Sequence, residues 1–283
     1  MLFDRIGVAD LPSIHNSKHF DAVESGRNAL NSHLAWLINL SCMGSGCFVR
    51  IIILEGAKMK ELAVLKSEVV GAICSGIRKA DREYGRWTGD EGLGEAPEYL
   101  VTCAIARELA KPSDGRFVTL EANVQETLRC ARVRFRGRPR RSMRKNGRAD
   151  IVLWEVPEVG QNGVPRSIIE VKNFLAEPGG QLNKDVRRLR DALCLSMGSH
   201  GELGFGCLAF WIGVNEPKQK KYESPEAWLR AKSEKLCDAA RSLVATDGLV
   251  VRLVQPKSYL GRYEDGTRYA WAPSVLVIER PAA

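Results

Sequence analysis

Hydrophobic residues recur at three- and four-residue steps in two segments of the first half of the chain. In residues 59–84 the repeated apolar positions are Leu62, Leu65, Val69, Ile73 and Ile77. In residues 96–111 they are Val101, Ile105 and Leu109, and Pro97 suits the first turn of a helix. This spacing puts the apolar side chains on one face, so both segments are predicted to be amphipathic helices.

Two short apolar runs in the middle of the chain predict a hairpin. Residues 150–156 and 167–172 read as strands, and the segment between them carries turn-forming proline, glycine and asparagine. We expect these strands to be antiparallel. In a strand, alternate side chains share a face, so Glu170 and Lys172 point the same way and Asp150 can reach that face from the neighbouring strand.

The rest of the chain predicts a mixed fold. The wholly apolar run 205–214 suits a central strand covered on both faces. A basic amphipathic helix is predicted after Gly180, with Leu182, Val186, Leu189 and Leu193 on its apolar face. Another helix is predicted at 224–244, and strands are predicted at 249–254 and 273–279. The predicted class is α/β, with a central mixed β-sheet flanked by helices, in one domain over residues 59–283.

Four segments are less regular. Residues 1–58 show no sustained period and are predicted to be a poorly defined N-terminal extension; Met59 is a hypothetical native start, which intact-mass measurement tests. A strand is predicted at 44–54. Residues 117–135 fit a helix or a strand, with an alternating end typical of a half-buried strand. Residues 256–271 look like a loop in which arginines and aromatic residues are interleaved. Ordinary loop composition explains this pattern, and stacking on nucleic acid is the functional alternative.

Composition limits the class of protein. Hydrophobic residues make up 45% and charged residues 27% of the chain, as in ordinary globular proteins. No apolar run has the length of a membrane span, and the first residues do not resemble a secretory signal. The cysteines form no CxxC pair, which favours reduced thiols in a cytoplasmic protein.

Positive charge is concentrated directly before Asp150. Of the net charge of +8, residues 129–148 contribute ten Lys or Arg and no acid, so the rest of the chain carries about −2. Such a block indicates a phosphate-binding surface, although a solvated loop without a partner is the alternative. The predicted nucleic-acid-binding residues are Arg132, Arg134, Arg136, Arg138, Arg140, Arg141, Arg144, Lys145, Arg148, Lys184 and Arg188.

Asp150, Glu170 and Lys172 are the candidate catalytic residues. Ionisable groups rarely stand in apolar strands unless they are paired or bind a metal. Two carboxylates this close favour a cation between them, and oxygen ligands without His or Cys favour Mg²⁺ or Mn²⁺. Such an ion activates water and neutralises charge on a phosphodiester, while a protonated Lys172 stabilises the transition state. Glu98, on the inward stripe of its helix, is a candidate third carboxylate; a first-turn acid favoured by the helix dipole is the alternative.

This arrangement resembles the PD-(D/E)xK nuclease superfamily. Asp150 and the Glu170-Val171-Lys172 triplet carry the resemblance, with an apolar strand after the Asp, an apolar run before the triplet and a basic amphipathic helix after it. The family commonly has an acid on an early core helix, for which Glu98 fits best and Glu108 second. Ala149 stands where many members have Pro. The resemblance covers about residues 96–215.

The resemblance implies a restriction-endonuclease-like core and a Mg²⁺- or Mn²⁺-dependent deoxyribonuclease. The implied metal ligands are Asp150, Glu170, Glu98 and the backbone carbonyl of Val171. DNA is the implied partner, in restriction, phage defence or repair, with no membrane contact; a homodimer stays open, because cutting both strands often needs two active sites. Alternatives are an ion-pair ladder on an edge hairpin and a non-catalytic nucleic-acid-binding protein that uses residues 129–148.

Overall fold

A computed structural model of the protein describes residues 46–89, 92–111, 115–135, 143, 147–156, 162–199, 201–216 and 222–281, with side chains from residue 61 onward. Residues 57–283 form one compact unit, separate from residues 1–56. Residues 1–45 of the predicted extension lie outside the described residues, and the status of 1–58 stays a prediction. None of the described helices has the combination of length and apolar sequence that crossing a membrane requires.

The described elements follow a mixed helix and strand order. In chain order they are α2 (Gly46–Thr88), α3 (Glu98–Leu109), β1 (Arg116–Asn123), α4 (Val124–Cys130), β2 (Arg148–Glu155), β3 (Val164–Lys172), α5 (Gly180–Gly198), β4 (Phe205–Asn215), α6 (Pro225–Val244), β5 (Val250–Val254), β6 (Tyr259–Arg262) and β7 (Arg268–Glu279). Within the described residues one open sheet has seven strands in the order β1-β2-β3-β4-β7-β5, and β6 also pairs with β7.

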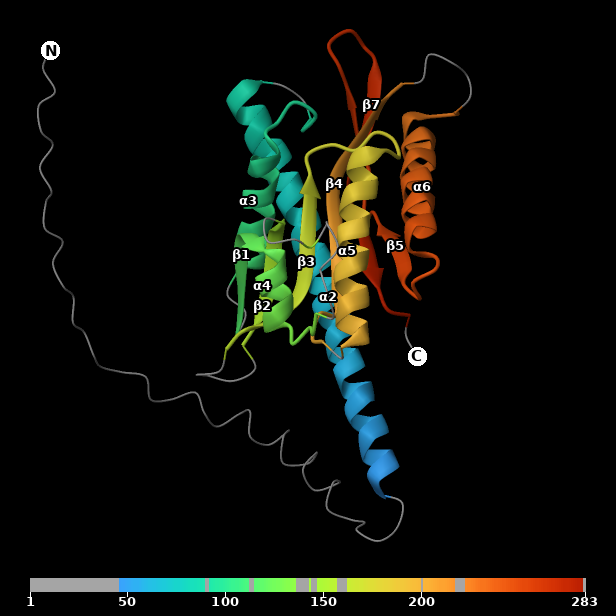
Figure 1. Ribbon diagram of the computed structural model, residues 1–283. Coiled ribbons are helices and arrows are strands. Elements are labelled where there is room, and N and C mark those ends of the chain that lie inside the picture. The colour runs from blue at the N-terminus through green and yellow to red at the C-terminus, as the bar shows by residue number, and fades with distance from the viewer. Residues whose placement is uncertain are drawn as a thin grey trace, which may run out of the picture. The chain divides into compact units, whose positions relative to one another are not determined.

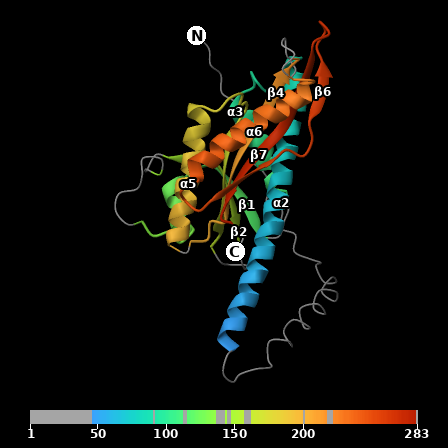
Figure 2. The ribbon, with the colours of Figure 1, turned by 90° about the vertical axis from the view of Figure 1, so that its right-hand side faces the viewer.

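The sheet is mixed because β3 and β4 run parallel while the other pairs are antiparallel. A parallel pair needs a crossover, and α5 supplies it. Helices cover both faces (Figures 1 and 2): α2 and α3 pack on one, and α4, α5 and α6 on the other. The predicted α/β class with a central mixed sheet is therefore confirmed.

The central strands are apolar because both of their faces are covered. On β4, Leu208 and Phe210 enter the core beneath α5 and α6, whereas Cys207 and Ala209 enter the core beneath α2 and α3. The predicted hairpin, the strand at 205–214 and the helix at 224–244 are confirmed. Ser224 caps that helix by accepting a hydrogen bond from Ala227 N at 3.2 Å.

Three local predictions are wrong. Residues 46–54 continue into α2 and are not a strand. Residues 117–135, which fit either a helix or a strand by sequence, contain one of each: β1 ends at Asn123, and the Asn123 side chain caps α4. The end of this segment, residues 131–135, is irregular rather than a strand. Residues 259–262 and 268–271 are strands of a β6–β7 ribbon, not a loop. The tyrosines and the tryptophan of this segment have strand propensity, but the ribbon forms through the pairing of β6 with β7, which propensity alone does not specify.

Close helix contact positions α3. Gly76 lies against the α3 backbone, and a Cβ there would come within 2.5 Å of Ile105 Cα. Next to this contact, the buried Glu108 accepts hydrogen bonds from Lys79 Nζ at 2.6 Å, Lys111 Nζ at 2.6 Å and Ser75 Oγ at 3.0 Å. Burial raises the pKa of Glu108, but hydrogen bonds from Lys111, Lys79 and Ser75 outweigh it and lower the pKa to about 2.

Replacing Glu108 with Gln should destabilise the protein by about 1–3 kcal/mol, the value of hydrogen bonds to a charged group. Because the folded-state pKa lies below that of the unfolded chain, this contribution is present above about pH 4.5 and is lost as the pH falls toward 2. Urea unfolding at pH 7 and pH 3 measures both effects. Glu83→Gln is the matched control, since its 4.0 Å pair with Arg107 is largely exposed; equal losses in both variants would contradict the prediction.

Candidate functional site

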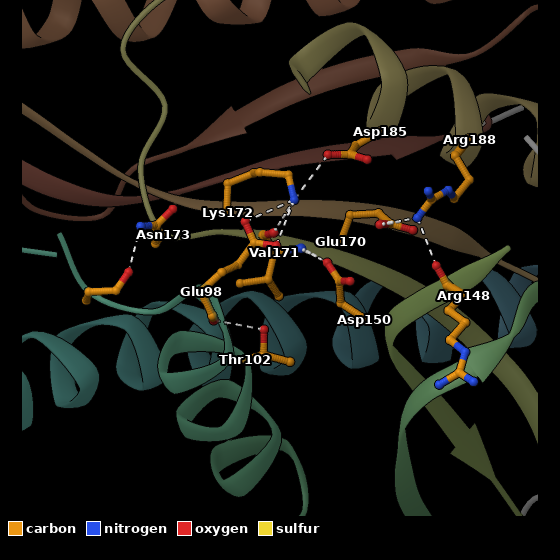
Figure 3. Close-up of polar contacts among 11 residues, drawn as sticks. Glu98, Thr102, Arg148, Asp150, Glu170, Val171, Lys172, Asn173, Asp185 and Arg188 are labelled. Carbon is orange, nitrogen blue, oxygen red and sulfur yellow. Dashed lines mark hydrogen bonds and ion pairs between the residues drawn. The ribbon is translucent and has the colours of Figure 1, made fainter. Parts of the chain in front are cut away.

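The hairpin register places Asp150 opposite Glu170. Ile151 pairs with Ile169 in this antiparallel hairpin. Asp150, which precedes Ile151, therefore lies beside Glu170, which follows Ile169, and both side chains are on the same face of the sheet. Asp150 Oδ2 accepts a hydrogen bond from Val171 N at 2.7 Å, which holds the carboxyl against β3 (Figure 3). Burial raises the pKa of Asp150, although the Val171 N–H and the nearby Lys172 ammonium act in the opposite direction.

Glu170 is the most deeply buried acid of the site, with 1% of its surface exposed. Its Oε2 accepts a hydrogen bond from Arg188 Nη1 at 2.7 Å. Its Oε1 is buried and has no hydrogen-bond partner among the described residues, and the same is true of Arg188 Nε. Burial, reinforced by the carboxyls of Asp150 and Asp185, raises the pKa of Glu170 to about 8 despite Arg188. The site thus holds an acceptor and a donor that a bound group could satisfy.

Lys172, the last residue of β3, connects the two layers of helices. Its ammonium donates to Glu98 Oε1 at 3.0 Å and to the Val171 carbonyl at 2.8 Å, and it lies 3.4 Å from Asp185 Oδ2. Burial lowers the pKa of Lys172, but the carboxylates of Asp185, Glu98 and Asp150 outweigh it and raise the pKa. The surrounding carboxylates therefore favour the protonated form of Lys172.

Glu98 is positioned by the loop that precedes α3. Asn173 Nδ2 lies 2.8 Å from Ala96 O, 3.3 Å from Gly94 O and 3.4 Å from Leu93 O. This amide joins the loop to the end of β3. Glu98 follows two residues later in the first turn of α3, and both of its oxygens face Lys172. The prediction of Glu108 as the second candidate for the acid of the site is wrong. Its carboxyl accepts hydrogen bonds from Lys79 and Lys111 at the contact between α2 and α3.

Two residues of the cluster were not predicted in their present roles. Asp185 is buried on α5 and faces Lys172. Arg188, predicted to contact nucleic acid, instead lies against Glu170 and also donates to the Arg148 carbonyl at 2.9 Å. A signal for Asp185 was present, since it stands three residues after Leu182 and four before Leu189, within the apolar stripe of α5.

The predicted nucleic-acid-binding surface is only partly described. Arg132, Arg134, Arg148 and Lys184 are exposed. Arg136, Arg138, Arg140, Arg141, Arg144 and Lys145 lie outside the described residues. The backbone of Arg148 borders the cluster through its bond to Arg188, while its side chain points away from Asp150 (Figure 3).

The donor set suits a divalent cation by charge. Four carboxyl groups, Glu98, Asp150, Glu170 and Asp185, face the two cations Lys172 and Arg188, which is an excess of two negative charges when all four carboxyls are ionised. Because the pKa of Glu170 is raised to about 8, its full ionisation at neutral pH requires a bound cation to displace the proton. No group of three or more His, Cys, Asp or Glu side chains in the described part of the chain has the geometry of a metal centre. Lys172 and Arg188 lie between the carboxyl groups in this structure. The argument that the site suits a divalent cation therefore rests on the excess of carboxyl groups and on the Glu170 Oε1 atom without a hydrogen bond.

Comparisons of the chain with known protein families, with curated proteins and with solved structures find no match.

Because Glu170 has a raised pKa, its folded form keeps a proton that the unfolded chain releases. Without added metal, we therefore expect the free energy of unfolding to fall as the pH rises from about 4.5 to 8. Glu170→Gln should reduce this slope. Urea unfolding in EDTA at pH 5 and pH 8 provides the measurement. An unchanged slope in the variant would rule out Glu170 as its source.

The Asn173 amide should control the order of the loop before Glu98. Asn173→Asp replaces the donor with a carboxylate that faces carbonyl oxygens, so the loop is expected to detach. Hydrogen exchange by mass spectrometry should then be faster in peptides covering residues 92–98. Asn183→Asp, at a partly exposed position of α5, is the control and should leave this exchange unchanged. Slow exchange in the Asn173 variant would contradict the proposed role of this amide.

Proposed function

We propose that the protein is a metal-dependent nuclease that hydrolyses phosphodiester bonds of DNA. The observation that carries the proposal is the convergence of Asp150, Glu170, Lys172 and Glu98 at the end of β3, from segments separated by up to 74 positions. A surface ion-pair ladder is a poor account of this cluster, because Glu170 and Asp185 are buried. Three buried atoms of the cluster, Glu170 Oε1, Asp185 Oδ2 and Arg188 Nε, also have no hydrogen-bond partner among the described residues.

Features of the PD-(D/E)xK resemblance support the proposal. The Asp and the Glu-x-Lys triplet occupy neighbouring strands of a mixed sheet, and an acid reaches Lys172 from the early helix α3. The basic amphipathic helix that follows is α5, which covers the face of the sheet on which Glu170 lies and contacts Glu170 through Arg188. We therefore propose a restriction-endonuclease-like core over residues 96–215.

The chain's own residues have distinct roles in this proposal. Asp150 and Glu170, with the Val171 carbonyl and Glu98, would hold Mg²⁺ or Mn²⁺. The bound ion would acidify a coordinated water and offset charge on the phosphate. Lys172, kept protonated by its carboxylate neighbours, stabilises negative charge on the phosphate oxygens. Asp185 orients the ammonium of Lys172, and Arg188 fixes the Glu170 carboxyl.

The decisive experiment is incubation of the purified protein with supercoiled, linear and single-stranded DNA in Mg²⁺, Mn²⁺ or EDTA. We expect metal-dependent cleavage, and a loss of at least about 100-fold in Asp150→Ala, Glu170→Ala and Lys172→Ala, in line with the loss of one transition-state donor. DNA binding should persist in these variants, because exposed arginines contribute it.

Lys66→Ala is the matched control. Lys66 pairs with Glu279, which is level with Phe205, whereas Lys172 is level with Phe210, five residues further along β4. The variant removes a paired lysine outside the cluster and should leave cleavage intact. Equal cleavage by wild type and Lys172→Ala would refute the enzyme proposal. Binding without metal-dependent cleavage of any substrate would favour the non-catalytic alternative.

A further inference from the structure

Four aromatic side chains form a continuous row that starts beside Lys172. Phe174, Trp211, Trp271 and Tyr259 have successive ring centroids 5.4, 6.1 and 4.4 Å apart. Each of these four residues is partly exposed. Phe174 follows Lys172 by two residues, and Tyr259 pairs with Trp271 across the β6–β7 ribbon. The row therefore connects the end of β3 with the ribbon.

Positive groups gather at the far end of this row. Lys257 Nζ lies 5.4 Å from the centre of the Tyr259 ring, and Arg78 on α2 donates to the Tyr259 hydroxyl at 3.1 Å. Arg82 and Arg86 follow at four-residue steps on the exposed side of α2. Among the described residues neither has an ion-pair partner. The ribbon and the adjoining helix thus combine aromatic rings with uncompensated positive charge.

We propose that this surface binds single-stranded nucleic acid and leads the strand to Lys172. The proposal rests on the nuclease function proposed above and narrows its substrate to single-stranded DNA or frayed duplex ends. Aromatic rings stack on any base, while cations contact the backbone. Duplex DNA keeps its bases stacked inside and would gain little from rings set in the protein surface. An acidic peptide would use the charge but not the row of rings.

The test is fluorescence anisotropy in EDTA with a labelled single-stranded 20-mer and with the same sequence as a duplex. Tyr259→Ala and the exposed Lys257→Glu should each weaken single-strand binding by roughly tenfold, the scale of one lost base–aromatic stack. Duplex binding should change much less. Tyr259→Phe keeps the ring and should retain most of the affinity, which separates stacking from loss of the hydroxyl.

Tyr222→Ala is the matched control. Tyr222 stacks on Trp228 at 6.0 Å, and Lys232 lies 5.0 Å from the Trp228 ring. This is similar chemistry on α6, which packs on the opposite face of the sheet. The variant should bind the single strand like the wild type, and an equal loss in Tyr222→Ala would overturn the proposal.

Three other outcomes would also overturn it: no preference of the wild type for single strand over duplex, unchanged binding in both Tyr259→Ala and Lys257→Glu, or equally tight binding of polyglutamate. The two proposals fail separately. Selective single-strand binding without metal-dependent cleavage removes the nuclease but leaves this surface. Cleavage with unchanged binding in both surface variants removes only the surface.

Discussion

A carboxyl group in the core needs a compensating partner, and the pair of Glu170 with Arg188 meets this constraint at the centre of the protein. Arg188 comes from α5, the helix that carries the chain from β3 to the parallel strand β4. The same guanidinium donates to the carbonyl of Arg148 at the start of β2. One cation thus joins the crossover helix to both strands of the hairpin. Removing it would leave a buried carboxyl with neither oxygen bonded.

The hydrogen bonding of the pair of Glu170 and Arg188 is incomplete, and the atoms left without partners could bind a further group. Glu170 retains an oxygen without a hydrogen-bond partner among the described residues, and Arg188 retains a buried N–H. A site designed only for stability would satisfy both atoms. The ammonium of Lys172, by contrast, has carboxyl partners from two helices, Glu98 on α3 and Asp185 on α5. The cluster is thus ordered by cations and still carries an excess of acids.

Sequence reasoning succeeded where one segment determines the outcome. The hairpin, the apolar β4 and the shared face of Glu170 and Lys172 follow from alternation and turn residues, and the structure has them. Prediction from sequence failed where contacts between distant segments determine the structure. The β6–β7 ribbon forms because β7 extends beyond β5, and no local pattern of residues 256–271 encodes that extension. The sequence predicts that Arg188 contacts nucleic acid at the surface, because its buried partner Glu170 lies 18 positions earlier and no local pattern links the two.

The contact between Lys172 and Glu98 spans 74 positions, whereas Asp150, Glu170, Lys172, Asp185 and Arg188 fall within one short stretch. Closing a longer loop costs more entropy, so contacts of large sequence separation are harder to form early in folding. The hairpin and its crossover helix can come together first, with Lys172 facing Asp185. Docking of α3 then adds Glu98 as the last carboxyl. The cluster is therefore complete only once α3 has docked on the strands that carry its other members.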